Sequence, residues 1–419
     1  MKTIEMFDAV VLRCFPENKF KQNCLSVQFL RPMCREEAAL NALIPAVLLR
    51  GTQHAPDLQA ITMRLDDLYG ASVGALVRKV GDYQTTGLYC SFIDDRFAFS
   101  GDRVMEPMIA FLGQLLFSPV LENGVFRQDY VQSEKRNLIQ TIESQKNDKR
   151  AYANEQLAKR MSKKDAFGLS RLGQIDQVEA ITPQTAYHHY RKILQESAIS
   201  ILYVGSAEPE QVADMLRPLF AGLSRNYVNL PPQAAFSDPP AGEHTQMLEV
   251  TQGKLCMGFV TPITFRDARF AAMQVLNMFF GGAMTSKLFM QVREAQSLCY
   301  DIGSGYHGSK GVMTVSAGID FDKEESVKEQ VCALLEDCRR GVFSQEELKA
   351  AKQALISQLQ GVHDSPGAIE NYYTSAFLSG LEKTPQAYMA AVEAVTAEQV
   401  AQAAMTLKLH TVYFLRGVR

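Results

Sequence analysis

The sequence predicts an α+β fold made of two homologous α/β-sandwich domains in tandem duplication. Its 419 residues exceed what one hydrophobic core usually serves. The segment GVFRQDYVQSEKRNLIQTI, which starts at Gly124, is repeated as GVFSQEELKAAKQALISQL, which starts at Gly341. A second pair of similar segments starts at Ile181 and at Val395, with nearly the same spacing. Because the two spacings agree this closely, we expect a tandem duplication of one structural unit.

Each half is expected to contain the same elements in the same order. Strands come first, then a helix, a strand, a helix that ends in a Gly-Val-Phe turn, a long helix, and a capped helix that leads into a last strand. Thr182 and Thr396 suit N-caps, with Pro183 at the first helical position. The β-branched runs AISILYVG and HTVYFLRG predict the last strands. Because strands and helices come in blocks, the class is α+β.

A hairpin and a linker complete this prediction. The stretch SLCYDIGSGYHGSKGVMTVSAGID, from Ser297, alternates as two strands around a Gly-rich turn. An edge strand there is suited to receive an extended peptide by strand addition. Two Pro-Pro pairs mark an extended linker between the halves. We therefore expect an N-terminal domain at 1–224, a linker at 225–243 and a C-terminal domain at 244–419.

Composition excludes several classes of function. A net charge of −3, with 47% hydrophobic and 21% charged residues, is ordinary for a globular protein and argues against nucleic-acid and membrane partners. No apolar run is long enough to span a membrane, and acids stand where a signal peptide would be basic. A cytoplasmic location is the expectation. The eight cysteines include no C-x-x-C pair, which favours reduced core thiols over a disulfide frame.

Two segments resemble the insulinase/pitrilysin family of zinc peptidases, in its mitochondrial-processing-peptidase-like branch. FFGGAMTSKLFMQVREAQSLCYDIGSGY, Phe279 to Tyr306, is similar to the family's Gly-Gly turn and Arg-Glu-x-x-x-Leu-x-Tyr signature. LLRGT, Leu48 to Thr52, is similar to the tail that follows the family's zinc motif. The resemblance covers nearly the whole chain. It implies the two-domain fold of these metallopeptidases.

The resemblance also implies that the zinc site is degenerate. In active members, His-x-x-Glu-His precedes the tail, and two histidines one helical turn apart bind zinc while the glutamate activates water. This places Ala42 and Ala46 at the histidine positions, Pro45 at the glutamate and Thr141 at the third ligand, although Glu143 lies near. Zinc needs nitrogen, sulfur or carboxylate donors. We expect no metal or other cofactor to be bound by this chain.

The second half keeps the substrate-binding part of the signature. The resemblance implies that Arg293 and Tyr300 hold a substrate carbonyl, a role suited to guanidinium and phenol donors. The alternative is that Arg293 pairs with a carboxylate on a helix surface and Tyr300 starts a core strand. Gly281 and Gly282 either bring backbone close to a bound peptide or permit a tight turn. His188 and His189, adjacent on a helix, are not expected to share a metal.

These expectations lead to one hypothesis of function and one rival. In the first, the chain is the non-zinc subunit of a heterodimeric peptidase whose paralogue carries zinc, and both act on unstructured peptides. In the rival, it is an inactive scaffold or peptide-binding protein, with a homodimer as one alternative. One bacterial branch with a similarly altered site is named for association with the modification of elongation factor P.

Overall fold

In the computed structural model of the chain, which describes residues 1–381 and 383–417, the fold consists of two compact units. Each unit takes segments from both halves of the sequence. Unit 1 contains Met1–Glu143, Ser170–Pro232 and His363–Ser375. Unit 2 contains Ser144–Leu169, Gln233–Val362 and the chain from Ala376 onward.

Unit 1 is built on a six-stranded mixed sheet. Its strand order is β1-β2-β8-β3-β5-β4, in which β2 and β8 are parallel and the other neighbours antiparallel. Both β3 and β8 are buried along most of their length, and β8 is a nearly unbroken apolar run, as expected of a strand covered on both faces. In contrast, β3 carries the buried polar residues Asn23, Ser26 and Gln28. The strands are β1 (Lys2–Phe7), β2 (Val10–Pro16), β3 (Gln22–Pro32), β4 (Ser72–Val80), β5 (Tyr83–Ile93) and β8 (Ala198–Gly205).

Over its described residues, unit 2 repeats this topology without a counterpart of β1. Its order is β9-β13-β10-β12-β11, and again the first pair is parallel while the others are antiparallel. The match to β2-β8-β3-β5-β4 confirms the α+β class and the duplication that the sequence predicts. The strands are β9 (Gly242–Leu248), β10 (Gly253–Val260), β11 (Asp301–His307), β12 (Val312–Ile319) and β13 (Lys408–Gly417).

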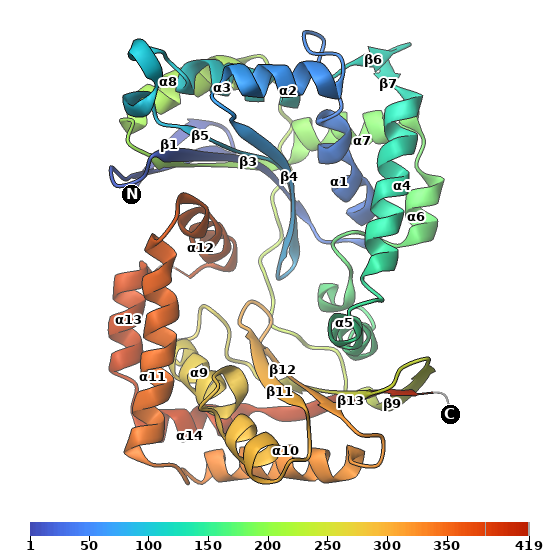
Figure 1. Ribbon diagram of the computed structural model, residues 1–419, viewed down its shortest axis with the longest axis vertical. Helices are drawn as coiled ribbons and strands as arrows, with labels where there is room; N and C mark the ends of the chain where they lie inside the picture. Colours follow the sequence, from blue (N-terminus) through green and yellow to red (C-terminus); the bar gives the residue numbers. More distant parts are fainter. Residues whose placement is uncertain (382, 418–419) are drawn as a thin grey trace. The chain divides into compact units, whose positions relative to one another are not determined.

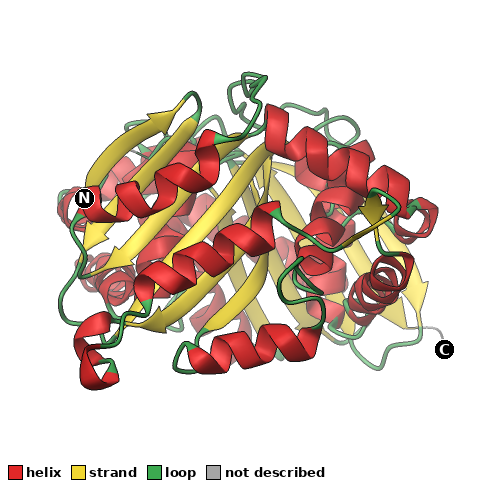
Figure 2. Cartoon of the chain, turned by 90° about the horizontal axis from the view of Figure 1, so that it is seen from above, coloured by secondary structure: helices red, strands yellow, loops and turns green. Residues whose placement is uncertain are grey.

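Helices form layers on these sheets. In unit 1, Figure 1 shows α2, α3 and α8 on one side of the sheet and α12 on the other, and Figure 2, seen from above, shows helices lying over the strands. The main apolar core of unit 1 lies between the sheet and α1, α3, α7 and α8. The helices of unit 1 are α1 (Arg35–Leu48), α2 (Leu58–Asp67), α3 (Met105–Phe117), α4 (Gln128–Ser144), α6 (Ile175–Ala180), α7 (Pro183–Glu196), α8 (Pro209–Ala221) and most of α12 (Pro366–Ser379).

Unit 2 contains both ordinary and unusual helices. Two of its helices, η4 and η5, are π-helices, a form that is rare and that the sequence pattern does not distinguish from an α-helix. The helical segments are α5 (Lys149–Met161), α9 (Phe270–Asn277), η4 (Met278–Gly282), η5 (Leu288–Ala295), α10 (Glu324–Arg339), α11 (Gln345–Gln360), α13 (Pro385–Glu393) and α14 (Ala397–Thr406). Short elements of the chain are β6 (Leu121–Glu122), β7 (Val125–Phe126) and the 3₁₀ turns η1 (Asp95–Phe97), η2 (Phe99–Gly101), η3 (Ala166–Gly168) and η6 (Gly361–His363).

The helix caps and strands predicted from local sequence are present. The Thr182 hydroxyl accepts from the N–H of Thr185, and Thr396 caps α14 in the same way, so these caps are confirmed. The two runs predicted as last strands form β8 and most of β13. The predicted hairpin forms β11 and β12. Residues 225–241 contain no helix or strand.

Two corresponding helices pack on the sheet of the other half of the sequence. The first residues of α5 and α12, Lys149 and Pro366, have the same spacing as the repeated segments that start at positions 124 and 341. In unit 2, α5 packs on β10 and β13 through Ala153, Leu157 and Met161. In unit 1, α12 places Glu370 on the sheet beside Ser26 and Gln28 of β3.

Two further observations concern the described residues alone. None of their helices has the length and apolar character needed to cross a membrane. All eight cysteines are free, and six are buried, as the prediction of core thiols requires, while Cys34 is half-buried and Cys332 exposed.

Candidate functional site

Helix α1 carries the positions at which the resemblance expects zinc ligands. Ala42 and Pro45 are buried and Ala46 is half-buried on this helix. Two methyl groups and a pyrrolidine ring offer no donor atom to a cation. The residues present therefore do not fit a zinc ion.

The remaining position expected for a ligand is on another helix. Thr141 lies on α4, where it is exposed and its hydroxyl donates to the carbonyl of Asn137, 2.8 Å away. Glu143, two residues on, is also exposed. Within residues 1–381 and 383–417, no group of three or more His, Cys, Asp or Glu side chains is arranged to hold a metal ion.

Pro45 also changes the backbone bonding of α1. A proline inside a helix has no N–H to donate to the carbonyl four residues earlier. Here that carbonyl belongs to Asn41, and it accepts a 2.6 Å hydrogen bond from the Thr86 hydroxyl of β5. The helix thus tolerates a proline at the position of the family's glutamate because a neighbouring strand satisfies the orphaned acceptor.

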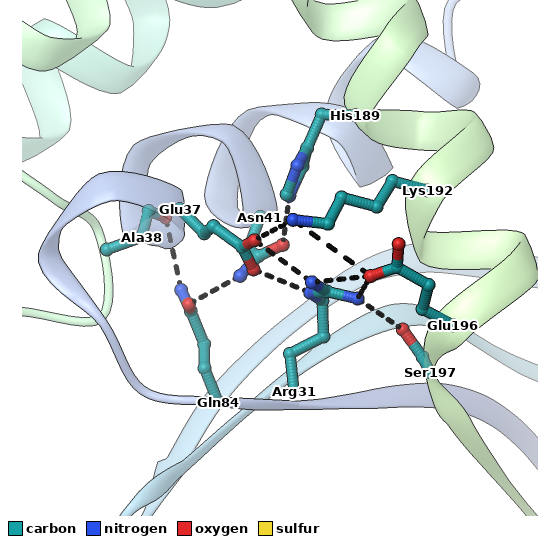
Figure 3. Close-up of polar contacts among 9 residues, drawn as sticks. All are labelled: Arg31, Glu37, Ala38, Asn41, Gln84, His189, Lys192, Glu196 and Ser197. Carbon is teal, nitrogen blue, oxygen red and sulfur yellow. Dashed lines mark hydrogen bonds and ion pairs between the residues drawn. The ribbon is translucent and has the colours of Figure 1, made fainter. Parts of the chain in front are cut away.

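A closed polar network lies beside these positions (Figure 3). The Asn41 amide donates to Oε1 of Gln84 at 2.8 Å, and its Oδ1 lies 2.8 Å from Nε2 of His189. Gln84 in turn donates to the carbonyls of Ala38 and Arg171. Because Asn41 Oδ1 can only accept, His189 must carry its proton on Nε2. Burial lowers the pKa of His189 to about 4, so the ring is neutral near pH 7.

An ionic cluster adjoins this network. Arg31 contacts Glu37 at 2.6 Å and Glu196 at 3.4 Å, and Lys192 contacts Glu37 at 2.8 Å. Burial alone would raise the pKa of Glu37, but the hydrogen bonds from Arg31 and Lys192 outweigh it and lower the pKa to about 2. Every charged group of this cluster is paired within unit 1, so the cluster holds α1 and α7 to the sheet.

Sequence reasoning missed this network because its members are far apart along the chain. Asn41 and His189 are 148 residues apart. One signal for the network was available in the sequence. Asn41 is the single amide side chain in the apolar stretch ALNALIPAVLL, and a buried polar side chain needs a hydrogen-bond partner. Of the two adjacent histidines, His189 is buried and its Nε2 faces Asn41.

The glycine pair of unit 2 allows a close approach between a π-helix and a strand. A Cβ on Gly281 would lie 2.7 Å from the backbone nitrogen of Ser304 in β11. A Cβ on Gly282 would lie 2.9 Å from the Asn277 amide. Both distances are shorter than a real Cβ contact permits. The glycines thus permit the close packing of η4 inside unit 2, and their role beside a bound peptide stays a prediction.

Arg293 and Tyr300 lie together at the surface of unit 2. Arg293 is on η5, and its Nε donates to the Tyr300 carbonyl at 2.9 Å. Its guanidinium lies 4.6 Å from the Phe289 ring centroid and 3.2 Å from the Glu294 carboxylate. Ser297, between the two residues, has φ +51°, a left-handed conformation that is uncommon outside glycine. The hydrogen bond from Arg293 to the Tyr300 carbonyl thus spans this turn.

Tyr300 immediately precedes β11 and has a hydrogen-bond partner of its own. Its side chain is 58% exposed, so it does not start a core strand. The hydroxyl donates to Oδ1 of Asp320 at 2.8 Å, and this bond raises the pKa of Tyr300. Both expected carbonyl donors are thus solvent-accessible, and both also make contacts within the chain.

Comparison with known proteins places these observations in a family. Residues 180–355 match a family model described as the peptidase M16 inactive domain. A Bacillus subtilis protein named probable inactive metalloprotease YmfF is 31% identical over 95% of this chain and 94% of its own length.

Solved structures share the fold over the whole chain. A conserved protein from Enterococcus faecalis superposes with a TM-score of 0.92 at 26% identity, covering 100% of this chain and 98% of that one. A peptidase M16 inactive domain from Pseudomonas fluorescens gives a TM-score of 0.82 at 17% identity, with 100% and 98% coverage, which shows likeness of fold.

Proposed function

We infer that this chain, which belongs to the peptidase M16 (insulinase) family, is the non-zinc subunit of a two-chain peptidase. Its partner is a paralogue that carries His-x-x-Glu-His and the zinc ion. The present chain supplies Arg293 and Tyr300 to a peptide carbonyl, and an unstructured peptide is the substrate.

The observation that carries the proposal is an asymmetry between the two units. Unit 1 has no donor atom at Ala42, Pro45 or Ala46, whereas unit 2 keeps a guanidinium and a phenol at its surface. Donors of this kind stabilise the charge that grows on a carbonyl oxygen as water attacks. At the positions of the family's zinc motif, however, Ala42, Pro45 and Ala46 offer no donor atom that could hold a metal to activate that water. The name of the B. subtilis relative, probable inactive metalloprotease, supports a lack of activity in the lone chain.

The test is a reconstitution. The chain is purified alone and together with a paralogue that carries the zinc motif, and hydrolysis of unstructured peptides is measured. We expect no hydrolysis by the lone chain and stimulated hydrolysis by the pair. Hydrolysis by the lone chain, with zinc that co-purifies in stoichiometric amount, would contradict the proposal.

Substitutions then test the role of the surface pair. Arg293→Ala or Tyr300→Phe should lower the turnover of the complex by about 10²-fold, as removal of one oxyanion-type donor does. Arg191→Ala is the matched control, because Arg191 is an exposed arginine on α7 of unit 1. Assembly, measured by size-exclusion chromatography, should be unchanged in all three variants.

A peptide-binding scaffold is the second candidate, and one observation favours it. The Tyr300 hydroxyl and the Arg293 Nε are already engaged by Asp320 and by the Tyr300 carbonyl. A scaffold would bind a partner chain or a peptide, or form a homodimer, without raising the rate of hydrolysis. Titrating the chain into the zinc-bearing paralogue while the rate is followed separates the two candidates.

A further inference from the structure

The hydroxyl of Tyr300 is directed to an acceptor inside its own unit. A phenol has one hydrogen to donate, and here Asp320 Oδ1 receives it at 2.8 Å. A hydrogen bond to a carboxylate is stronger than one to a neutral carbonyl. In the observed geometry Tyr300 therefore cannot donate to a peptide carbonyl at the same time.

The backbone around Tyr300 is fixed, whereas its side chain is free to turn. The Tyr300 N–H donates to the Gly318 carbonyl at 2.8 Å, and its carbonyl accepts from Arg293. The preceding residue, Cys299, is buried. Only rotation about the side-chain bonds can therefore move the hydroxyl, and 58% exposure leaves room for it.

Asp320 is also fixed at its backbone and open to solvent at its side chain. It follows the last residue of β12, Ile319, and its carbonyl accepts from the N–H of Lys323. Its side chain is exposed, so water can solvate the carboxylate after the phenol leaves. The bond is thus reversible without leaving a buried charge unpaired.

We propose that Asp320 is a positioning residue that competes with the peptide carbonyl for the hydroxyl of Tyr300. In the free chain, the Asp320 carboxylate accepts the hydrogen bond from the phenol. A bound peptide carbonyl must displace Asp320 before Tyr300 can donate to it. This inference rests on the carbonyl-binding role proposed for Tyr300, and it goes further by naming the group that restrains that role.

The test uses the reconstituted pair of subunits. Asp320→Ala should raise kcat/KM by about tenfold, with the gain shared between a lower KM and a higher kcat, because the phenol no longer has to leave Asp320 before it donates to the peptide carbonyl. Asp320→Asn should give a smaller rise, since the amide oxygen remains a weaker acceptor. Asp322→Asn, a nearby aspartate on the same turn, is the matched control and should leave both constants unchanged.

A double-mutant cycle shows whether Asp320 acts through Tyr300. In a Tyr300→Phe background, Asp320→Ala should have no effect on turnover. A fall in turnover with Asp320→Ala, or an equal change in both backgrounds, would overturn the inference. If Tyr300→Phe alone changes nothing, the proposed role of Tyr300 fails instead, so the two failures are distinguishable.

A binding measurement on the chain alone provides a readout that does not need the partner. The fluorescence anisotropy of a labelled unstructured peptide gives the Kd for each variant. Asp320→Ala should tighten binding several-fold when residue 300 is tyrosine and leave it unchanged when it is phenylalanine. Equal affinities for the parent chain and Asp320→Ala would count against competition.

Discussion

At the scale of single residues, Thr86 and Pro45 form a compensating pair. The Thr86 hydroxyl takes the place of the helical N–H that proline removes from the Asn41 carbonyl. We expect Thr86→Val to lower the free energy of unfolding by about 1–2 kcal/mol, because a buried acceptor loses its donor. Urea unfolding measures this change.

The same pair has an internal control. Pro45→Ala restores an N–H that can donate to Asn41, so Thr86→Val should cost less in that background than in the parent chain. Equal costs in both backgrounds would mean that the hydroxyl does not replace the helical bond. This double-mutant cycle distinguishes the loss of the hydrogen bond to the Asn41 carbonyl from a change in packing at position 86.

His189 gives unit 1 a predictable dependence on pH. Burial lowers its pKa to about 4 in the folded chain, against an ordinary value of 6.5. The unfolded chain therefore takes up the proton first, so stability falls as the pH decreases from about 6.5 to about 4. The loss amounts to about 3 kcal/mol at most, since each pKa unit corresponds to about 1.4 kcal/mol.

His189→Gln should remove this loss. Glutamine keeps an N–H for Asn41 Oδ1 but does not titrate. The variant should show a flat free energy of unfolding between pH 6.5 and about 4.5, where the parent chain declines. Below that range both proteins should lose stability, because the pKa of Glu37 is lowered to about 2 and its ion pair is lost as the pH falls further. A parallel decline in both proteins above pH 4.5 would show that His189 is not the titrating group.

At the scale of elements, α12 places a buried carboxylate on the sheet of unit 1. Glu370 is 1% exposed, and it accepts from Ser26 at 2.8 Å, from Gln28 at 3.0 Å and from Arg78 at 2.7 Å. Ala153, which holds the corresponding position of the repeat on α5, is buried in an apolar cluster instead. The two corresponding helices thus make different contacts at this position of the repeat.

Arg78→Ala should destabilise unit 1 by about 3 kcal/mol, since breaking a buried ion pair leaves a charge without its partner. Hydrogen exchange of the α12 amides should accelerate in step with the loss of unfolding free energy. Arg78→Ala combined with Glu370→Ala should cost less than the sum of the single changes. Additive costs would show that Arg78 and Glu370 do not interact in solution.

The elements that sequence predicts well are those fixed by local chemistry. Thr182 and Thr396 cap helices because the capping hydroxyl and its N–H partner are three residues apart, and β8 and β13 follow from β-branched runs. The π-helical form of Leu288–Ala295 was not predictable, because the same apolar spacing suits an α-helix. Nor was the bond between Tyr300 and Asp320, which depends on how β11 pairs with β12.

At the scale of the whole molecule, each unit needs a segment from the other half of the sequence. Unit 1 includes His363–Ser375, and unit 2 includes Ser144–Leu169. A cut in the stretch expected as the linker, 225–243, leaves each fragment without the helix that packs on its sheet. In unit 2, the loss of α5 would expose an apolar sheet face that includes Cys256, Tyr413 and Leu415. In unit 1, the loss of α12 would leave Arg78 without Glu370.

We therefore expect fragments 1–232 and 233–419 to behave differently apart and together. Expressed singly, each should bind a dye specific for exposed apolar surface and should lack a cooperative thermal transition, because the missing helix leaves the sheet uncovered. Co-expressed, they should co-purify as a one-to-one complex that unfolds cooperatively, since all segments of both units are then present. A fragment 1–232 that unfolds cooperatively alone, with no gain from its counterpart, would show that α12 is dispensable to unit 1 and that the division at 225–243 is the true folding boundary.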